Sequence, residues 1–164
     1  MNLCDRLEVQ ALLARHGFRF SKSMGQNFLI DAAIPMQIAA SAGLDETVGV
    51  LEIGPGIGAL TAELAKRAGR VTAVELDRAL LPVLAETLAP YANANVVSGN
   101  ILKCNLKELV SSSFPGLTPV VCANLPYNIT SPVLSASVSA AFTVRSACAA
   151  AALSRSSVHF SLYW

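Results

Sequence analysis

The sequence has little charge, and the charge it has is unevenly distributed. Asp, Glu, Lys and Arg make up 14% of its 164 residues, hydrophobic residues make up 53%, and the formal net charge is +1. This composition argues against a disordered chain, and the length suits a single domain with a sizeable core. Glu108 is the last acidic residue, and beyond it only Arg145 and Arg155 carry charge. A near-neutral total does not exclude a nucleic-acid partner, because it can hide a local basic patch.

Cysteine is scarce and shows no pattern. The four cysteines are Cys4, Cys104, Cys122 and Cys148. They form no CxxC pair and have no histidine at the spacing of a zinc site, so we expect no metal. Such cysteines fit a reducing cytosol. No secretion signal is expected, since Asp5, Arg6 and Glu8 occupy the place of its apolar core.

The sequence also lacks a clean hydrophobic run, although its mean hydropathy is positive at +0.51. A membrane-spanning helix needs about 20 mostly apolar residues. The longest uncharged stretch, residues 109–144, is interrupted by prolines, asparagines and a glycine. We therefore expect a soluble, cytoplasmic protein with no membrane partner.

Short apolar segments alternate with amphipathic ones after residue 47. The predicted strands are 48–53, 70–76, 95–99 and 119–123, the last preceded by a polar connection. The predicted helices are 3–16, 32–42, 59–69 and 77–90. Strands that alternate with helices are typical of a parallel sheet covered on both faces. The pattern therefore predicts an α/β protein with a doubly wound, mostly parallel sheet.

A glycine-rich turn, LEIGPGIG, follows the first predicted strand. Gly54, Gly56 and Gly58 let the backbone approach a ligand there, and the next helix supplies N–H donors. Glu75 ends the second strand, where an acid can accept hydrogen bonds from ribose hydroxyls. The spacing differs from the GxGxxG of dinucleotide sites. Glu52 suits a cation such as the sulfonium and ammonium groups of S-adenosylmethionine, unless it is a solvated strand residue.

Polar residues follow the third and fourth strands as well. Asn100, in SGNIL, could accept a hydrogen bond from a cofactor adenine, or could simply belong to a turn. The segment 124–127, NLPY, follows the fourth strand. Because ligands bind beyond the carboxyl ends of parallel strands, we expect this segment beside the glycine-rich turn.

The order of residues in NLPY suits methylation of a nucleobase amine. The Asn124 amide oxygen and the Leu125 carbonyl can accept the two N–H bonds of an exocyclic amine, which favours the pyramidal amine needed for attack on a methyl group. Pro126 restricts Leu125 to an extended conformation. Tyr127 would stack on a base turned out of its helix. The structural alternative is a proline-terminated strand with Tyr127 in the core.

Five motifs occur in a collinear order that resembles a known family. They are MGQNFLID, LEIGPGIGALT, VTAVELD, SGNIL and NLPYNITSP, within residues 17–133. Together they resemble the small-subunit ribosomal RNA adenine N6,N6-dimethyltransferases, which have a Rossmann-like S-adenosylmethionine-dependent methyltransferase fold. The resemblance implies methylation of N6 on two adjacent adenosines near the 3′ end of small-subunit rRNA, during ribosome biogenesis. The implied partner is this rRNA or the assembling small ribosomal subunit, and we expect a monomer.

The resemblance also implies roles for single residues. The target adenine would be held by Asn124, Leu125, Pro126 and Tyr127. The cofactor contacts implied are Asn27, Leu29, Gly54, Glu75, Asn100 and Asn124, to which the glycine-rich turn adds Glu52, Gly56 and Gly58. Arg19 and Lys22 could meet RNA phosphates or lie in a solvated loop. The related large-subunit rRNA methyltransferases that confer macrolide resistance share the NLPY motif, but GPGIGALT looks more like the small-subunit enzymes.

Two features depart from the family pattern. Asn100 stands where Asp is usual, and a charge-assisted hydrogen bond is roughly twice as strong as a neutral one, so we expect weaker cofactor binding. Residues 135–164 are rich in Ser and Ala and resemble neither the rest of the family's sheet nor its helical RNA-binding domain. We therefore expect a catalytic part at 1–134, with a sheet incomplete after its fourth strand. The tail would be either an Ala-rich helix with a frayed end or foreign to the fold. A truncated remnant that at most binds cofactor is the alternative function.

Overall fold

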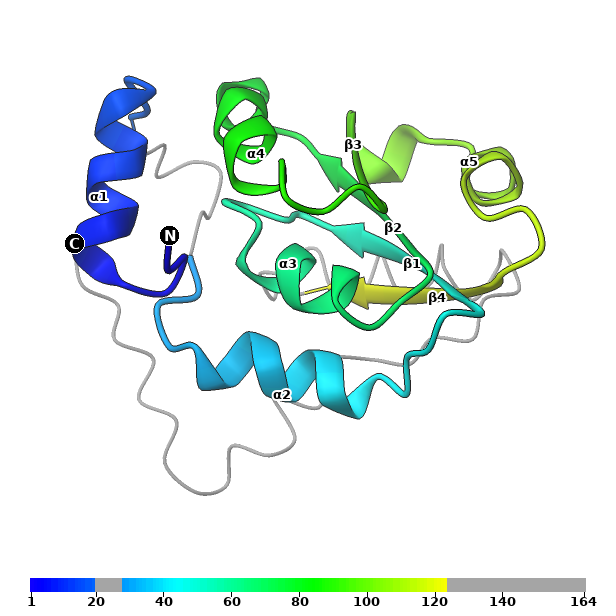
Figure 1. Ribbon diagram of the computed structural model, residues 1–164. Coiled ribbons are helices and arrows are strands. Elements are labelled where there is room, and N and C mark those ends of the chain that lie inside the picture. Colours follow the sequence, from blue (N-terminus) through cyan, green and yellow to red (C-terminus); the bar gives the residue numbers. More distant parts are fainter. Residues whose placement is uncertain (20–27, 124–164) are drawn as a thin grey trace, which may run out of the picture.

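The computed structural model describes residues 1–19 and 28–123; residues 20–27 and 124–164 are not described. Four strands form one sheet in which every neighbouring pair is parallel. They are β1 (Val48–Ile53), β2 (Arg70–Glu75), β3 (Ala94–Ser98) and β4 (Thr118–Ala123), in the spatial order β3-β2-β1-β4 (Figure 1). The four predicted strands are confirmed, with ends that differ by one residue at most.

The order in which the chain adds strands to the sheet reverses beside β1, although all the strands are parallel. The chain adds β2 and then β3 on one side of β1 and returns to add β4 on the other. In this register Ile53 lies opposite both Val74 and Ala123. The C-terminal ends of β1, β2 and β4 therefore lie at one edge of the sheet, and at such a switch point open α/β sheets bind their ligands.

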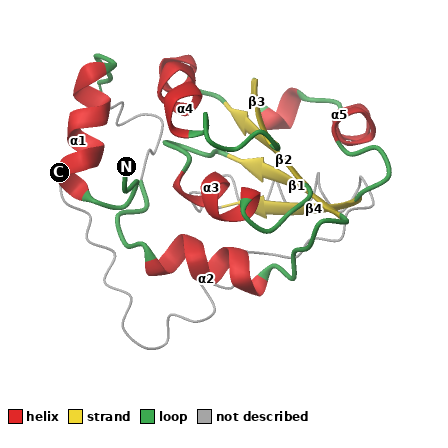
Figure 2. Cartoon of the chain, in the orientation of Figure 1, coloured by secondary structure: helices red, strands yellow, loops and turns green. Residues whose placement is uncertain are grey.

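Helices pack on both faces of the sheet. They are α1 (Arg6–Arg15), α2 (Ala33–Ser41), α3 (Ala59–Ala65), α4 (Leu81–Thr87) and α5 (Leu106–Ser113), with 3₁₀ turns η2 (Arg78–Leu80) and η3 (Ile101–Lys103). Side chains alternate along β1, so that Val50 packs with Leu64 of α3, while Leu51 packs on the opposite face with Phe114 at the end of α5. Figure 2 shows α5 across the sheet from α3, which confirms the doubly wound architecture. No helix in the described ranges is long and apolar enough to cross a membrane.

The helix boundaries follow local signals in the sequence. Asp5 caps α1 by accepting hydrogen bonds from two backbone N–H groups. The helix predicted at 77–90 begins as the turn η2, and Pro82 occupies the first turn of α4, where its missing N–H costs nothing. Helix α5 occupies a segment expected as a polar connection. Its signal was a capping pair, in which Asn105 Oδ1 accepts from the Glu108 N–H at 3.3 Å.

Gly69, between α3 and β2, has no room for a side chain. A Cβ atom there would lie 2.1 Å from the carbonyl oxygen of Glu46, in the loop before β1. We predict that Gly69→Ala lowers the free energy of unfolding by at least about 2 kcal/mol, because backbone must shift to relieve the overlap. Gly116→Ala is the control, since Gly116 has a φ of +77° but a Cβ atom there would meet no described residue within 4 Å. Its cost should be about 1 kcal/mol. Equal losses in urea denaturation would contradict the steric explanation.

Candidate functional site

The glycine-rich turn bends tightly off the end of β1. The three glycines Gly54, Gly56 and Gly58 have φ values of 69°, 59° and 90°, in the left-handed region that favours glycine. The Gly54 N–H donates to the Val74 carbonyl at 3.0 Å, which ties the turn to β2. Among the described residues, a Cβ atom on Gly54 would meet nothing within 4 Å, so they leave space beside this backbone that a ligand could enter.

Helix α4 and Phe28 support the other two glycines. A Cβ atom on Gly58 would lie 3.0 Å from Thr87 Oγ1, and one on Gly56 would lie 3.2 Å from the ring of Phe28. Phe28 was not among the predicted site residues, although it lies in the MGQNFLID motif between Asn27 and Leu29. Its ring lies 6.3 Å from the ring of Phe18, at an interplanar angle of 56°.

Glu75, at the end of β2, is buried and held by backbone donors. Its Oε1 accepts from the Asp77 N–H at 2.8 Å, and its Oε2 accepts from the Gly56 N–H at 3.3 Å. Burial raises the pKa of Glu75 above its usual range, while these two N–H groups act to lower it. Each carboxylate oxygen can accept a second hydrogen bond, so the group is oriented to receive a pair of hydroxyls.

Glu52 is the most buried acid of the site, with only 1% of its surface exposed. The alternative interpretation of Glu52 as a solvated strand residue is therefore wrong, because its position on β1 turns the side chain under α3. Burial raises the pKa of Glu52 to about 8; the nearby Thr61 hydroxyl lowers it, and the charge of Glu75 raises it further. Among the described residues, neither Glu52 Oε2 nor Thr61 Oγ1 reaches a partner in hydrogen-bonding geometry. Unpaired buried groups are costly and call for an explanation, which a bound cation would supply.

A hollow at this edge of the sheet brings several predicted residues together. It is lined by Phe28, Leu29, Glu52, Gly54, Pro55, Gly56, Ile57, Ala59 and Leu60. Glu75 joins it through its hydrogen bond to Gly56. Cys122 is the partner of Glu52 in the register of β4, and burial raises its thiol pKa to about 12, so it stays neutral beside the acid. Glutamates and open glycine backbone fit a cationic nucleoside better than a phosphate.

Asn100 lies beyond β3 and acts as a helix cap. Its Oδ1 accepts from the Leu102 N–H at 3.0 Å and begins η3. The preceding Gly99 N–H donates to the Glu75 carbonyl at 2.8 Å, which fixes the start of this turn against β2. The side chain is thus a turn residue, as one interpretation proposed, and its oxygen can still accept a second hydrogen bond.

The remaining predicted residues are not brought into this site by the described structure. Arg19 is exposed, while Asn27, Lys22 and the NLPY segment, residues 124–127, lie outside the described residues. The described residues also hold no group of three or more His, Cys, Asp or Glu that could bind a metal ion.

Comparison with known proteins assigns a family to this arrangement. The sequence model of the family described as ribosomal RNA adenine dimethylase matches residues 17–155. The chain belongs to this family. It is 53% identical over 133 residues to ribosomal RNA small subunit methyltransferase A of Ligilactobacillus salivarius, an alignment that covers 80% of this chain and 45% of the relative. The chain thus spans less than half the length of this curated relative.

Solved structures agree with the fold of this family. The crystal structure of the 23S rRNA methyltransferase ErmE has a TM-score of 0.60 and 36% identity, covering 70% of this chain and 43% of that one. The crystal structure of a dimethyladenosine transferase from Plasmodium falciparum has a TM-score of 0.55 and 29% identity, covering 66% and 37%. These similarities confirm the Rossmann-like methyltransferase fold.

The raised pKa of Glu52 makes stability depend on pH. The unfolded chain releases this proton near its ordinary pKa of 4.5, whereas the folded chain keeps it to about pH 8. The unfolded state therefore binds fewer protons in this interval, and the contribution of Glu52 to stability falls as pH rises, by up to about 1.4 kcal/mol per pH unit. We predict that Glu52→Gln gains stability relative to the unmodified chain between pH 5 and pH 8, measured by urea denaturation.

Glu63 on α3 provides the matched control. Although its partial burial acts to raise the pKa, ion pairs with Lys66 and Arg67 outweigh that effect and lower it overall. Glu63 therefore contributes stability above its unfolded pKa and loses it in acid. Glu63→Gln should lose stability relative to the unmodified chain as pH rises through the acidic range. This pH dependence is opposite in sign to that of Glu52→Gln. Parallel curves for Glu52→Gln and the unmodified chain would show that Glu52 is not protonated in the fold.

Proposed function

We propose that the chain is an S-adenosylmethionine-dependent methyltransferase that dimethylates N6 of two adjacent adenosines near the 3′ end of small-subunit rRNA, in ribosome biogenesis. The observation that carries the proposal is the buried Glu52 carboxyl beside the glycine-rich turn, whose Oε2 has no hydrogen-bond partner among the described residues. A carboxyl that is costly to bury alone is stabilised by a cation, and family membership makes S-adenosylmethionine the cation to consider. When bound, S-adenosylmethionine supplies an electrophilic methyl group.

Two acids among the described residues would bind different parts of the cofactor. Glu52 would pair with the ammonium end of the cofactor and release its proton to solvent, since a neighbouring positive charge lowers a carboxyl pKa. Glu75, already oriented by the Gly56 and Asp77 N–H groups, would accept the ribose hydroxyls. Gly54 lets the backbone lie close to the cofactor, and Leu29 and Asn27 would cover it. Asn100 would accept from the adenine amine.

The NLPY segment would hold the target base. Its Asn124 amide oxygen and Leu125 carbonyl would accept the two N–H bonds of the adenine N6 amine and keep its lone pair available. Pro126 would aim the Leu125 carbonyl, and Tyr127 would stack on the flipped base. The register supports this assignment, because Ala123 lies opposite Ile53, directly before the glycine-rich turn.

The substrate and the domain limits belong to the same proposal. Residues 1–134 would form the catalytic part, and the Ser/Ala-rich residues 135–164 would lie outside it. Arg19 and Lys22 would contact phosphates of small-subunit rRNA, and the chain would act as a cytoplasmic monomer. Methylation of large-subunit rRNA is the second candidate, favoured by the similarity to ErmE. The 53% identity to a small-subunit enzyme supports the first.

The first test separates cofactor binding from methyl transfer. A ligand that binds only the folded chain adds about 2.7 kcal/mol of stability at one hundred times its dissociation constant, so S-adenosylmethionine should raise the unfolding midpoint. Asn124→Ala should abolish methyl incorporation into small-subunit rRNA and keep most of this thermal shift. Asn128→Ala, four residues along the same segment, is the control and should remain active. Undiminished methylation by Asn124→Ala would overturn the role of Asn124, and a midpoint indifferent to the cofactor would overturn the proposed function.

The second test concerns the adenine contact. Asn100→Asp keeps the cap on Leu102 but offers the adenine amine a charged acceptor. We predict that it tightens S-adenosylmethionine binding by about fivefold, the effect of roughly 1 kcal/mol. Isothermal titration calorimetry measures this change. Asn105→Asp, which also caps a helix but begins α5, should leave the affinity unchanged. Unchanged binding by Asn100→Asp would remove Asn100 from the cofactor site.

A further inference from the structure

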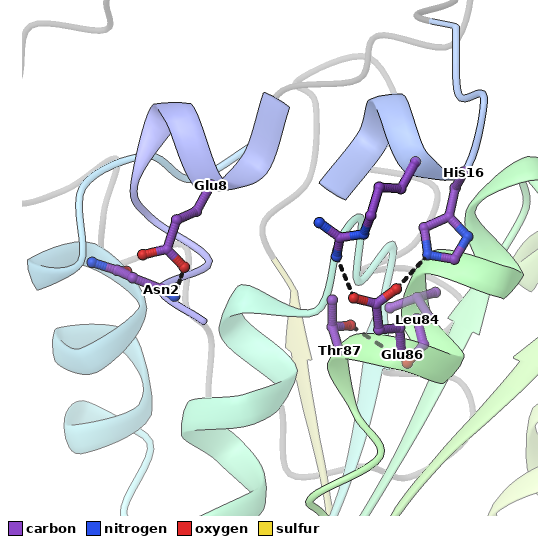
Figure 3. A network of polar contacts seen from close by, with 7 residues as sticks. Asn2, Glu8, His16, Leu84, Glu86 and Thr87 are labelled. Atoms are coloured by element: carbon purple, nitrogen blue, oxygen red, sulfur yellow. Dashed lines mark hydrogen bonds and ion pairs between the residues drawn. The ribbon is translucent and has the colours of Figure 1, made fainter. Parts of the chain in front are cut away.

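An ion-pair cluster joins the first helix to the fourth, and its residues are not ones that the proposed function uses. The Glu86 carboxylate on α4 accepts from Arg15, and its Oε2 lies 2.7 Å from His16 Nε2 (Figure 3). Both partners lie at the C-terminal end of α1. These hydrogen bonds lower the pKa of Glu86, so it remains a carboxylate in neutral solution. The cluster therefore holds one end of α1 against α4.

Beneath the cluster, an apolar interface extends from these helices to the glycine-rich turn. Its buried members are Val9, Leu12 and Leu13 of α1, Leu80, Val83, Leu84 and Leu88 from η2 to the end of α4, and Ile57 of the turn. Phe18 and Phe28 pack against the same set. Ile57 is thus held by the packing of α1 on α4, not by the sheet alone.

The cluster supports the turn from two directions. Thr87 follows Glu86 directly, and its Oγ1 would lie 3.0 Å from a Cβ atom on Gly58. On the other side, the chain leaves α1 through Gly17, and the Phe18 N–H donates to the Leu13 carbonyl at 2.9 Å. Phe18 then packs on Phe28, whose ring lies over Gly56.

We infer that Glu86 is a positioning residue for the glycine-rich turn. By fixing the end of α1 on α4, it holds Phe18 and Phe28 against Gly56 and keeps the turn in the form that receives a ligand. The Arg15 and Glu86 side chains are 55% and 40% exposed, and exposed ion pairs add little to global stability. Loss of Glu86 should therefore loosen the turn locally, not unfold the chain. The consequence for cofactor affinity rests on the proposed function, whereas the effect on the turn does not.

The decisive experiment follows amide hydrogen exchange in the full chain without ligand. The Gly58 N–H donates to the Pro55 carbonyl at 2.9 Å and the Gly56 N–H donates to Glu75, so both amides should be protected. Glu86→Ala should speed exchange at Gly56 and Gly58 by about threefold or more, because the open form of the turn becomes at least about three times as populated. The amides of β1 should keep their rates.

Matched variants distinguish the positioning of the turn by Glu86 from the effect of removing any carboxylate. Glu63→Ala removes a carboxylate that also pairs with two cations, but these lie just after the end of α3, so the exchange of Gly56 and Gly58 should be unchanged. Arg15→Ala should reproduce part of the Glu86→Ala effect, and the double variant should show less than the product of the two. If Glu86→Ala unfolds the chain, Glu86→Gln replaces it, because the amide keeps the shape of the side chain.

Cofactor affinity gives a second readout with its own outcome. If S-adenosylmethionine binds the unmodified chain, Glu86→Ala should raise its dissociation constant by at most about threefold, since affinity falls with the fraction of competent protein. Exchange at Gly56 and Gly58 that is unchanged in Glu86→Ala, or that rises by less than about threefold, would overturn the inference. A lowered unfolding midpoint beside that result would show that the role of Glu86 is structural. Failure of the unmodified chain to bind S-adenosylmethionine would overturn the proposed function and leave the exchange test of Glu86 valid.

Discussion

In the centre of the sheet, hydrogen bonding of β1 to β2 on one side and to β4 on the other aligns the ends of three strands. Ile53 lies opposite Val74 and Ala123, so the C-terminal ends of the three strands lie at one edge of the sheet. Central strands that are buried on both faces resist a shift in register, because a shift would move apolar side chains out of their packing. The glycine-rich turn can therefore adopt left-handed conformations on a rigid base.

The buried acids at this edge of the sheet favour the binding of a cation but lower the stability of the folded chain. Glu52 and Glu75 are both buried, and burial raises the pKa of each, although Glu75 recovers two backbone hydrogen bonds. Glu52 accepts no such backbone hydrogen bonds at its Oε2 among the described residues, and only the Thr61 hydroxyl acts to lower its pKa. A folded chain that must keep this proton is less stable above the ordinary pKa of a carboxyl than one with a neutral residue there. Such costs are common where a site is built to receive an opposite charge.

Packing gives the site a second support outside the sheet. Helix α4 backs Gly58 through Thr87, and Phe28 covers Gly56, so a Cβ atom on either glycine would crowd a neighbour at 3.0 or 3.2 Å. Ile57, between them, belongs to the apolar interface of α1 and α4. The turn thus depends on three contacts made by different parts of the chain.

Local patterns in the sequence were sufficient to predict the strands, the glycine-rich turn and the position of Glu75. Hydrophobic periodicity, turn residues and the residues that end a strand all depend on neighbours along the chain. The roles of residues 124–127 stay predictions. Tertiary structure alone decided that Glu52 is buried, with its Oε2 unpaired among the described residues, and that Phe28 lies on Gly56. It also decided that Glu86 meets Arg15, 71 residues away along the chain. Such contacts depend on how helices pack on the sheet, and no pattern within one segment encodes that packing.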